Sequence, residues 1–307
     1  VKTSARRTAT FFDAEPPPPK LPRALQYGDD STPLPSLEEW DPEETARQLT
    51  LIDFEAFCAI GPSELAGLAW TTSRLRHLAP NVNFCIARHT RLSAAVIEMI
   101  LIRERFADRE RAIRYFIDVA WHLKHIGNFN SMFAVAAGLE NSAVRRLSVA
   151  WGALDRETQR RHSEIMELLC VTGNHRAVRE ALVSHAPPAM PFLGIFLTDL
   201  VFINQGVSEW THQVEGKGLI NFAKRYKEYE MIADLLRYQN FGFNFVRVPA
   251  LLRMFQPPML SSLTVPFHEF ENEMLALSRL REPPHRYTPG DAEVASIKVT
   301  HALDDLF

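Results

Sequence analysis

A long apolar stretch of the chain reads Phe192-Leu-Gly-Ile-Phe-Leu-Thr-Asp-Leu-Val-Phe-Ile-Asn-Gln-Gly206 and directly follows Pro191. A proline at the start of a helix costs no hydrogen bond, because the first N–H groups lack partners within the helix. Gly206 stands where many helices end in a left-handed residue. Three residues interrupt the apolar run: Gly194, Thr198 and Asp199. The pattern predicts a helix buried nearly all round, by the protein's own core or by a partner.

A second helix is predicted from Gly218 to Gln239, after a connecting loop of about a dozen residues. Its apolar residues recur at every third or fourth position: Leu219, Phe222, Tyr226, Tyr229, Ala233 and Leu236. We expect this stripe to pack on the first helix, so that the pair forms a helical hairpin with some apolar surface to spare. The cations Lys224, Arg225 and Lys227 stand among acids and are predicted to face solvent.

The composition is that of an ordinary globular protein. The chain has 307 residues, 46% of them hydrophobic, and a formal net charge of -3 with both signs mixed along it. This balance excludes the basic footprint of a nucleic-acid-binding protein. The three cysteines, Cys58, Cys85 and Cys170, argue against a disulfide framework and for a reducing compartment. No signal peptide or membrane segment is visible, and because the chain begins with Val1 we expect a fragment of a longer protein.

Two proline-rich ends flank the body of the chain. Residues 1–40 contain the tetraproline Pro16–Pro19, and this composition predicts a linker or N-terminal extension that buries little surface. A ligand for an aromatic-grooved proline-binding domain is the alternative, and a spacer is the simpler interpretation. Residues 41–282 form the body, and residues 283–307 are predicted to be a C-terminal extension.

The body is predicted to be all-α, a single large orthogonal helical bundle with a protruding helical hairpin. Asp41-Pro-Glu-Glu44 gives a helix start, with an N-cap acceptor, proline at the first position and two acids in the first turn. Ser131 and Asp155 are predicted to cap two later helices. Apolar spacing predicts the remaining helices at 63–70, 82–105, 108–126, 132–139, 142–154, 155–169, 175–183, 248–255 and 266–280. Residues 241–247 are the one segment predicted to be extended.

The residues carry no recognisable covalent chemistry. The chain has no phosphate-binding glycine loop, no Gly-x-Ser-x-Gly motif and no paired cysteine motif. His122 and His125 lie one helical turn apart and could share a metal, but no third ligand stands at a diagnostic spacing. Two partly exposed histidines are the simpler interpretation, so we expect neither a metal nor a cofactor. A scaffold, a binding module and a regulator that acts by binding all stay open at this point.

Several blocks of the body resemble the catalytic domain of Ras-type guanine-nucleotide exchange factors, in the family's order. They are Asp41 to Ile52; Pro62-Ser-Glu-Leu65 with Trp70; Asn128-Phe-Asn130, Gly138-Leu139, Val144-Arg-Arg-Leu147 and Trp151; Pro191 to Leu200; and Leu219-Ile-Asn-Phe-Ala-Lys224. No single block is decisive, but their common order and spacing make chance a poor explanation. The resemblance spans about residues 41–282.

The resemblance implies a partner and a mechanism. The partner would be a small GTPase of the Ras superfamily, of Ras, Rap or Ral type, whose first switch the hairpin pushes aside to open the nucleotide site. Val201 matches the position whose apolar side chain lies where the Mg²⁺ would be, and Gln205 matches the position where many members place an acid near the phosphates. Both are therefore predicted catalytic positions. Gln205 departs from the family pattern, because an amide has no charge to repel phosphate.

Further positions match the surface that anchors the second switch of the GTPase. They are Ala87, Arg88, Thr90, Ala120 and Phe192, with Thr198 in the first hairpin helix. The two alanines are smaller than the branched residues expected there, which implies a pocket that is wider or filled from elsewhere. Asn128 and Asn130 are predicted to be buried amides that support the base of the hairpin through hydrogen bonds.

The resemblance thus predicts an exchange factor that promotes GDP release and GTP loading by binding, without covalent chemistry. The alternative is a catalytically weak or inactive member of the fold that serves as a GTPase- or adaptor-binding scaffold, which Gln205 and the small pocket residues motivate. We expect a cytoplasmic protein with no nucleic-acid partner, recruited to membranes by parts outside the fragment. The family often carries a separate helical domain that steadies the hairpin, and residues 1–40 are too short and proline-rich to form it.

Overall fold

The described part of the computed structural model is almost entirely helical, which confirms the predicted all-α class. It comprises residues 15–23, 25, 36–214, 217–255 and 266–283. Most of the two predicted extensions, 1–40 and 283–307, lies outside these ranges. The tetraproline is described and has no regular secondary structure.

The elements follow one another with short connections. The α-helices are α2 (Pro42–Cys58), α3 (Pro62–Leu65), α4 (Pro80–Leu101), α5 (Phe106–Ile126), α6 (Phe129–Glu140), α7 (Ser142–Arg145), α8 (Ser148–Gly152), α9 (Arg156–Leu169), α10 (Thr172–Ser184), α11 (Leu193–Gly206), α12 (Phe222–Leu236), α13 (Pro249–Met254) and α14 (Phe267–Arg281). Four 3-10 helices are η1 (Leu37–Glu39), η2 (Ala66–Thr71), η3 (Arg76–Leu78) and η4 (Arg237–Asn240). The strands are β1 (Trp210–Val214) and β2 (Lys217–Ile220).

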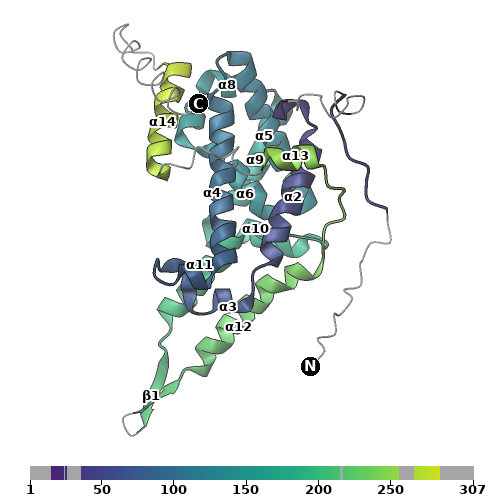
Figure 1. Cartoon of the computed structure of the whole chain (residues 1–307). Coiled ribbons are helices and arrows are strands. Elements are labelled where there is room, and N and C mark those ends of the chain that lie inside the picture. Colours follow the sequence, from purple (N-terminus) through teal and green to yellow (C-terminus); the bar gives the residue numbers. More distant parts are fainter. Residues whose placement is uncertain (1–14, 24, 26–35, 215–216, 256–265, 284–307) are drawn as a thin grey trace.

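The centre of the bundle is α6, which contacts both α4 and α5, while α2 packs on the same two helices (Figure 1). Nearly every residue of α6 is buried. A helix that is apolar on all sides must be enclosed by its neighbours. The enclosed helix of this fold is therefore α6. In α11 burial on all sides is confined to the first half, Leu193 to Leu200, apart from Thr198 and the partly exposed Gly194, and the second half emerges from the bundle.

Local capping signals place several helix starts. The Asp41 carboxylate accepts hydrogen bonds from the N–H groups of Glu43 (2.8 Å) and Glu44 (3.4 Å) and starts α2 as predicted. Asp155 accepts from Thr158 N at 2.8 Å and starts α9. The cap of α6 is Asn128, not Ser131 as predicted, because the Asn128 side chain accepts from Ser131 N at 3.0 Å. The predicted helix 142–154 divides into α7 and α8.

The connection between α11 and α12 is a two-stranded antiparallel ribbon, so the predicted loop is wrong. Trp210 pairs with Ile220 across the ribbon, and the Trp210 ring covers Gly218, where an added Cβ would lie 3.0 Å from the ring. The ribbon forms the end of an arm made of α11, β1, β2 and α12, which leaves the bundle with the second half of α11 (Figure 1). A hairpin of two helices alone is not confirmed. Residues 241–247, predicted to be extended, form no strand.

The aromatic stripe of α12 is exposed, which corrects the predicted packing. Phe222, Tyr226 and Tyr229 are all more than half exposed, whereas Lys224 and Leu235 are buried. Lys224, Glu228, Met231 and Leu235 also follow helical spacing. Periodicity identifies a face of a helix but not which face a neighbour covers, so it could not choose between the two stripes.

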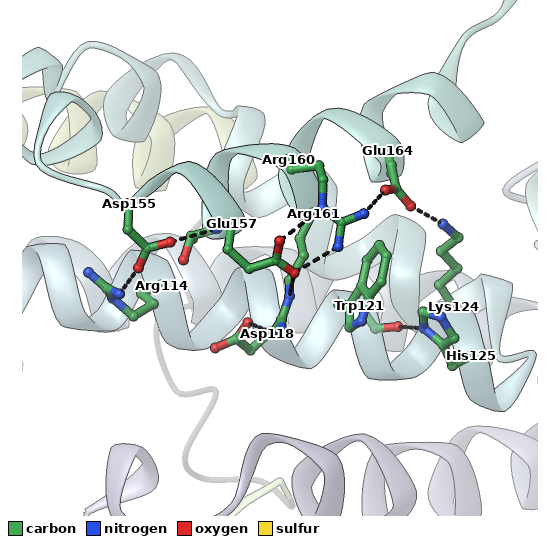
Figure 2. A network of polar contacts seen from close by, with 11 residues as sticks. Arg114, Asp118, Trp121, Lys124, His125, Asp155, Glu157, Arg160, Arg161 and Glu164 are labelled. Atoms are coloured by element: carbon green, nitrogen blue, oxygen red, sulfur yellow. Dashed lines mark hydrogen bonds and ion pairs between the residues drawn. The ribbon is translucent and has the colours of Figure 1, made fainter.

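A network of ion pairs joins α5 to α9 along one side of the bundle (Figure 2). Arg161 pairs with Asp118 at 2.6 Å, and Lys124 pairs with Glu164 at 2.9 Å. The ammonium of Lys124 also lies 4.5 Å from the centre of the Trp121 ring, which gives a cation–π contact. These partly exposed pairs contribute modestly one by one, but together they fix how α9 lies on α5.

The tight packing of α6 on α4 yields a test of the core. An added Cβ at Gly138 would lie 2.7 Å from both the Ser93 carbonyl oxygen and Val96 Cβ. We expect Gly138→Ala to lower the free energy of unfolding by about 1–3 kcal/mol through overpacking. Urea denaturation followed by circular dichroism measures this change.

Gly152 in α8 provides the matched control, because an added Cβ there meets nothing within 4 Å. We expect Gly152→Ala to change the free energy of unfolding by less than about 1 kcal/mol. Equal stability of the two variants would contradict the packing described for α6.

Candidate functional site

The exposed side of α11 carries one stripe of side chains. Thr198, Val201, Phe202 and Gln205 stand at spacings of three and four residues and therefore share a face. Thr198, Phe202 and Gln205 are exposed, and Val201 is partly buried. Phe202 is 65% exposed and was not among the predicted site residues. Phe202 follows Thr198 by about one helical turn, so the two side chains share a face and Phe202 leaves the core together with Thr198. This spacing was the available signal in the sequence.

The start of α11 is tied to the junction of α5 and α6. Met190 N donates to the Gly127 carbonyl, and Phe129 N donates to the Met190 carbonyl, both at 2.9 Å. Gly127 has a φ of 83°, the left-handed conformation that glycine adopts without strain. The Asn130 side chain accepts from Leu193 N at 3.4 Å. The arm thus leaves the bundle at a position fixed by hydrogen bonds.

Asn128 belongs to a buried polar network below this junction. Its side-chain amide donates to Thr50 Oγ1 at 3.0 Å and to Ser131 Oγ at 2.8 Å. The Ser131 hydroxyl donates to the carboxylate of Asp53, which also pairs with Arg88 Nε. A buried carboxylate is tolerated only when it is paired and hydrogen-bonded, and Asp53 meets both conditions. The supporting role of Asn128 and Asn130 stays a prediction, now with defined partners.

The N-terminal half of α4 presents a second exposed face beside this network. Phe84, Ala87, Arg88 and Arg91 follow helical spacing, and Phe84 is 54% exposed. Ile86 is also exposed, and Thr90 donates to the Ile86 carbonyl at 3.2 Å. Phe84 and Ile86 were not among the predicted site residues. The signal for them in the sequence was two large apolar residues close to the predicted positions Ala87 and Arg88.

Two predicted partner-binding positions lie deeper than expected. Ala120 is 0% exposed on the core side of α5, so the described surface gives a partner no access to it. Phe192 is half-buried, and its ring stacks on Phe133 with centroids 4.2 Å apart and on His89 at 5.3 Å. Gly194 is required beside it, because an added Cβ would lie 2.6 Å from Phe192 Cζ. In the free protein Phe192 therefore fixes the start of α11.

The far end of α11 is held by a buried ammonium. Lys224 is 1% exposed, and its Nζ donates to the Asn204 carbonyl at 2.8 Å and pairs with Glu209 at 2.5 Å. The prediction that Lys224 faces solvent is wrong. The carbonyls of the last helical turn lack partners within the helix, and a cation there is favourable. Lys224 thus joins the end of α11 to the start of α12.

The charges near Gln205 are already neutralised within the arm. Glu209 pairs with both Lys224 and Arg225, and Arg225 also pairs with Glu228 at 2.7 Å. Neither Glu209 nor Glu228 is therefore a free carboxylate that could take the place of an acid at Gln205. The exposed stripe of α11 itself carries no formal charge.

The described residues contain no group of three His, Cys, Asp or Glu side chains that could hold a metal ion. His125 Nδ1 lies 2.8 Å from the Trp121 carbonyl within its own helix (Figure 2). No helix in the described ranges is long and apolar enough to cross a membrane. What the geometry offers is two exposed faces, on α4 and on α11, placed by buried hydrogen bonds.

A family model described as RasGEF domain matches residues 44–226. The chain belongs to the RasGEF domain family. It is 33% identical over 275 residues to Ras guanine nucleotide exchange factor A of Dictyostelium discoideum. The aligned region covers 89% of this chain and 44% of that protein. Factor J of the same organism is 33% identical to this chain, and the aligned region covers 81% of this chain and 30% of factor J. Factor I is 32% identical, and the aligned region covers 93% of this chain and 32% of factor I. The chain thus spans less than half the length of these relatives.

The RasGEF match contains both exposed faces and the buried network, and it ends within α12. The match neither reaches α14 nor tests the proposed end of the domain at residue 282. Family membership supports the resemblance on which the site residues were selected. The role of each residue stays a prediction.

His89 on α4 stacks on Phe192, just before α11, and gives a test of the site's electrostatics. Burial lowers the pKa of His89 from its ordinary value of 6.5, an effect that the nearby Asp53 carboxylate partly offsets. The unfolded chain therefore binds this proton more tightly than the folded protein, and the contribution of His89 to stability falls as the pH drops through 6.5. We expect a lower urea midpoint at pH 5.5 than at pH 7.5.

The histidine responsible is identified by comparing two variants. In His89→Gln the difference between the two urea midpoints should shrink, because the buried titrating ring is gone. His125→Gln, at an exposed position, should keep the wild-type difference. A pH dependence that is unchanged in His89→Gln would show that other groups cause it.

Proposed function

We propose that this RasGEF domain is a guanine-nucleotide exchange factor for a Ras-family GTPase, which it binds so as to promote GDP release and GTP loading. The observation that carries the proposal is the uncharged, partly apolar stripe of α11, held at both ends by hydrogen bonds. The names of the relatives describe exchange factors of this kind. The type of GTPase, Ras, Rap or Ral, is left to experiment.

The mechanism needs binding energy and no covalent step. Picomolar nucleotide binding corresponds to about 16 kcal/mol. Contacts that form only when the nucleotide site is open must offset much of this energy, and Val201 and Phe202 can supply apolar contacts of that kind. Coupling is reciprocal: a protein that weakens nucleotide binding is itself displaced by nucleotide. Incoming GTP would therefore release the domain.

The face of α4 is proposed to hold the second switch of the GTPase. Phe84 and Ile86 offer apolar surface, and Ala87 leaves room beside them. Arg88 uses its Nε on Asp53, so only its terminal amino groups can serve a partner. Phe84 lies about one helical turn before Ala87, and its larger side chain can fill the pocket that the small side chain of Ala87 leaves wide.

Rigid placement favours exchange over simple scaffolding. A wedge that bends on contact would lose the free energy needed to open the partner, whereas a preorganised one does not. The hydrogen bonds at Met190 and the buried Lys224 fix the two ends of α11. A binding scaffold without exchange is the alternative, and the missing acid at Gln205 is the observation that favours it.

The direct test is release of a fluorescent guanine nucleotide from Ras, Rap and Ral proteins. We expect the domain to accelerate release from at least one of them at micromolar concentration. In Val201→Glu and Phe202→Asp we expect the exchange rate to fall by about tenfold or more, because a charge replaces an apolar contact at the centre of the interface. Phe192→Ala is a poor probe, since the internal stack would also be lost.

Val171→Glu is the matched control, because it introduces the same charge at an exposed valine outside the two faces. It should exchange at the wild-type rate, and circular dichroism should show all three variants folded. A stable complex with a GTPase without accelerated release would establish the scaffold instead. Equal exchange by Val201→Glu and wild type would contradict the site assignment.

Gln205 tests how far charge contributes. If the stripe is aimed at the phosphates, we expect Gln205→Glu to speed nucleotide release severalfold, because a carboxylate repels them in a site of lowered dielectric. Gln205→Met, of similar size and without charge, should exchange close to wild type. Slower release in Gln205→Glu would show that this end of α11 does not face the phosphates.

A further inference from the structure

The connection from α3 into α4 is unusual in its charge. Residues 65–97 contain no Asp or Glu and four arginines, Arg74, Arg76, Arg88 and Arg91, although the whole chain has a formal net charge of -3. Elsewhere in the chain, as along α9, cations and acids are interleaved and pair with one another. A one-sided charge distribution of this kind creates a local positive field.

Three of these arginines are available to a partner. Arg88 pairs with Asp53, but no described carboxylate forms an ion pair with Arg74, Arg76 or Arg91. All residues from 71 to 78 are exposed: Leu75 lies between Arg74 and Arg76, and His77 and Leu78 follow, with Leu78 54% exposed. We call Arg74, Leu75, Arg76 and Leu78 the basic–apolar surface.

Hydrogen bonds attach this surface to α4. The Asn83 side chain donates to the carbonyls of Arg76 at 3.0 Å and Ala79 at 2.7 Å. The buried Glu64 carboxylate accepts from Asn81 N at 2.7 Å and Val82 N at 3.1 Å, at the start of α4. Asn83 directly precedes Phe84, so the basic–apolar surface continues the exposed face of α4.

The same connection also reaches the arm. The 3-10 helix η2, which leads into the basic–apolar surface, contacts α11, and α3 contacts α12 (Figure 1). The surface is thus placed at the junction of bundle and arm, next to both exposed faces. A partner held by those two faces would lie beside it.

We propose that the basic–apolar surface is a further part of the GTPase interface and selects GTPases that carry carboxylates opposite Arg74 and Arg76. This rests on the proposed function. Arginines around exposed apolar side chains are typical of protein interfaces. An anionic lipid surface is the weaker fit, because lipid-binding segments usually gather about four to eight Lys or Arg residues. Charge at the rim of an interface acts chiefly on association rate and specificity.

The test compares two double variants that change the net charge equally. Arg74→Glu/Arg76→Glu should lower kcat/KM for the responsive GTPase by about tenfold or more at low salt, with kcat nearly unchanged, because steering is lost. The loss should shrink at about 0.5 M salt, where charges are screened within about 5 Å. The control Arg253→Glu/Arg279→Glu, on α13 and α14, should stay close to wild type.

Leu78→Ser tests the apolar part separately: it should raise KM with little dependence on salt. Equal effects of the two double variants, or no effect of Arg74→Glu/Arg76→Glu in a domain that exchanges, would overturn the proposal. Binding to phosphatidylserine vesicles that is lost in that variant, with exchange in solution unchanged, would overturn it in favour of lipid. Absence of exchange by the wild type on every GTPase would instead refute the proposed function.

Discussion

Two backbone hydrogen bonds at Met190 are the constraint on which the geometry of the arm depends. They join Met190, three residues before the start of α11, to Gly127 and Phe129, where α5 turns into α6. Because α6 is enclosed by α4 and α5, the direction of α11 is set by the best-packed part of the bundle. A helix anchored only by exposed contacts would have no fixed direction. Here the buried core determines where the exposed stripe of α11 points.

The buried polar groups extend this constraint to the second face. Asp53 connects Arg88 on α4 with Ser131 on α6, and Asn128 connects Ser131 with Thr50 on α2. Networks of this kind are costly when incomplete and rigid when every member is satisfied. The network therefore fixes the position of the exposed face of α4 relative to the start of α6, where the residues before α11 are attached. A partner that touches both faces meets two surfaces whose separation is already set.

Some local signals in the sequence predicted the structure correctly. Asp41 and Asp155 cap their helices because capping depends on a few neighbouring residues. Sequence reasoning failed where the signal depended on distant contacts. Apolar spacing placed Tyr226 on a packed face, but the tie from Lys224 to Asn204 turns that face outward. The exposures of Phe84 and Phe202 depend on what surrounds them in space, and in the sequence only their spacing from Ala87 and Thr198 pointed to them.

The placement of charge bears on how such a domain would act. Gln205 is neutral, and the nearest acids of the arm, Glu209 and Glu228, are paired with Lys224 or Arg225. These two carboxylates are thus engaged by cations within the arm. Under the proposed function, displacement would then depend on occupying the space that the nucleotide and its metal need, and Val201 and Phe202 are the residues proposed to occupy it. Arg74 and Arg76 form no ion pair with a described carboxylate, so their positive charge can attract a partner but cannot expel a phosphate.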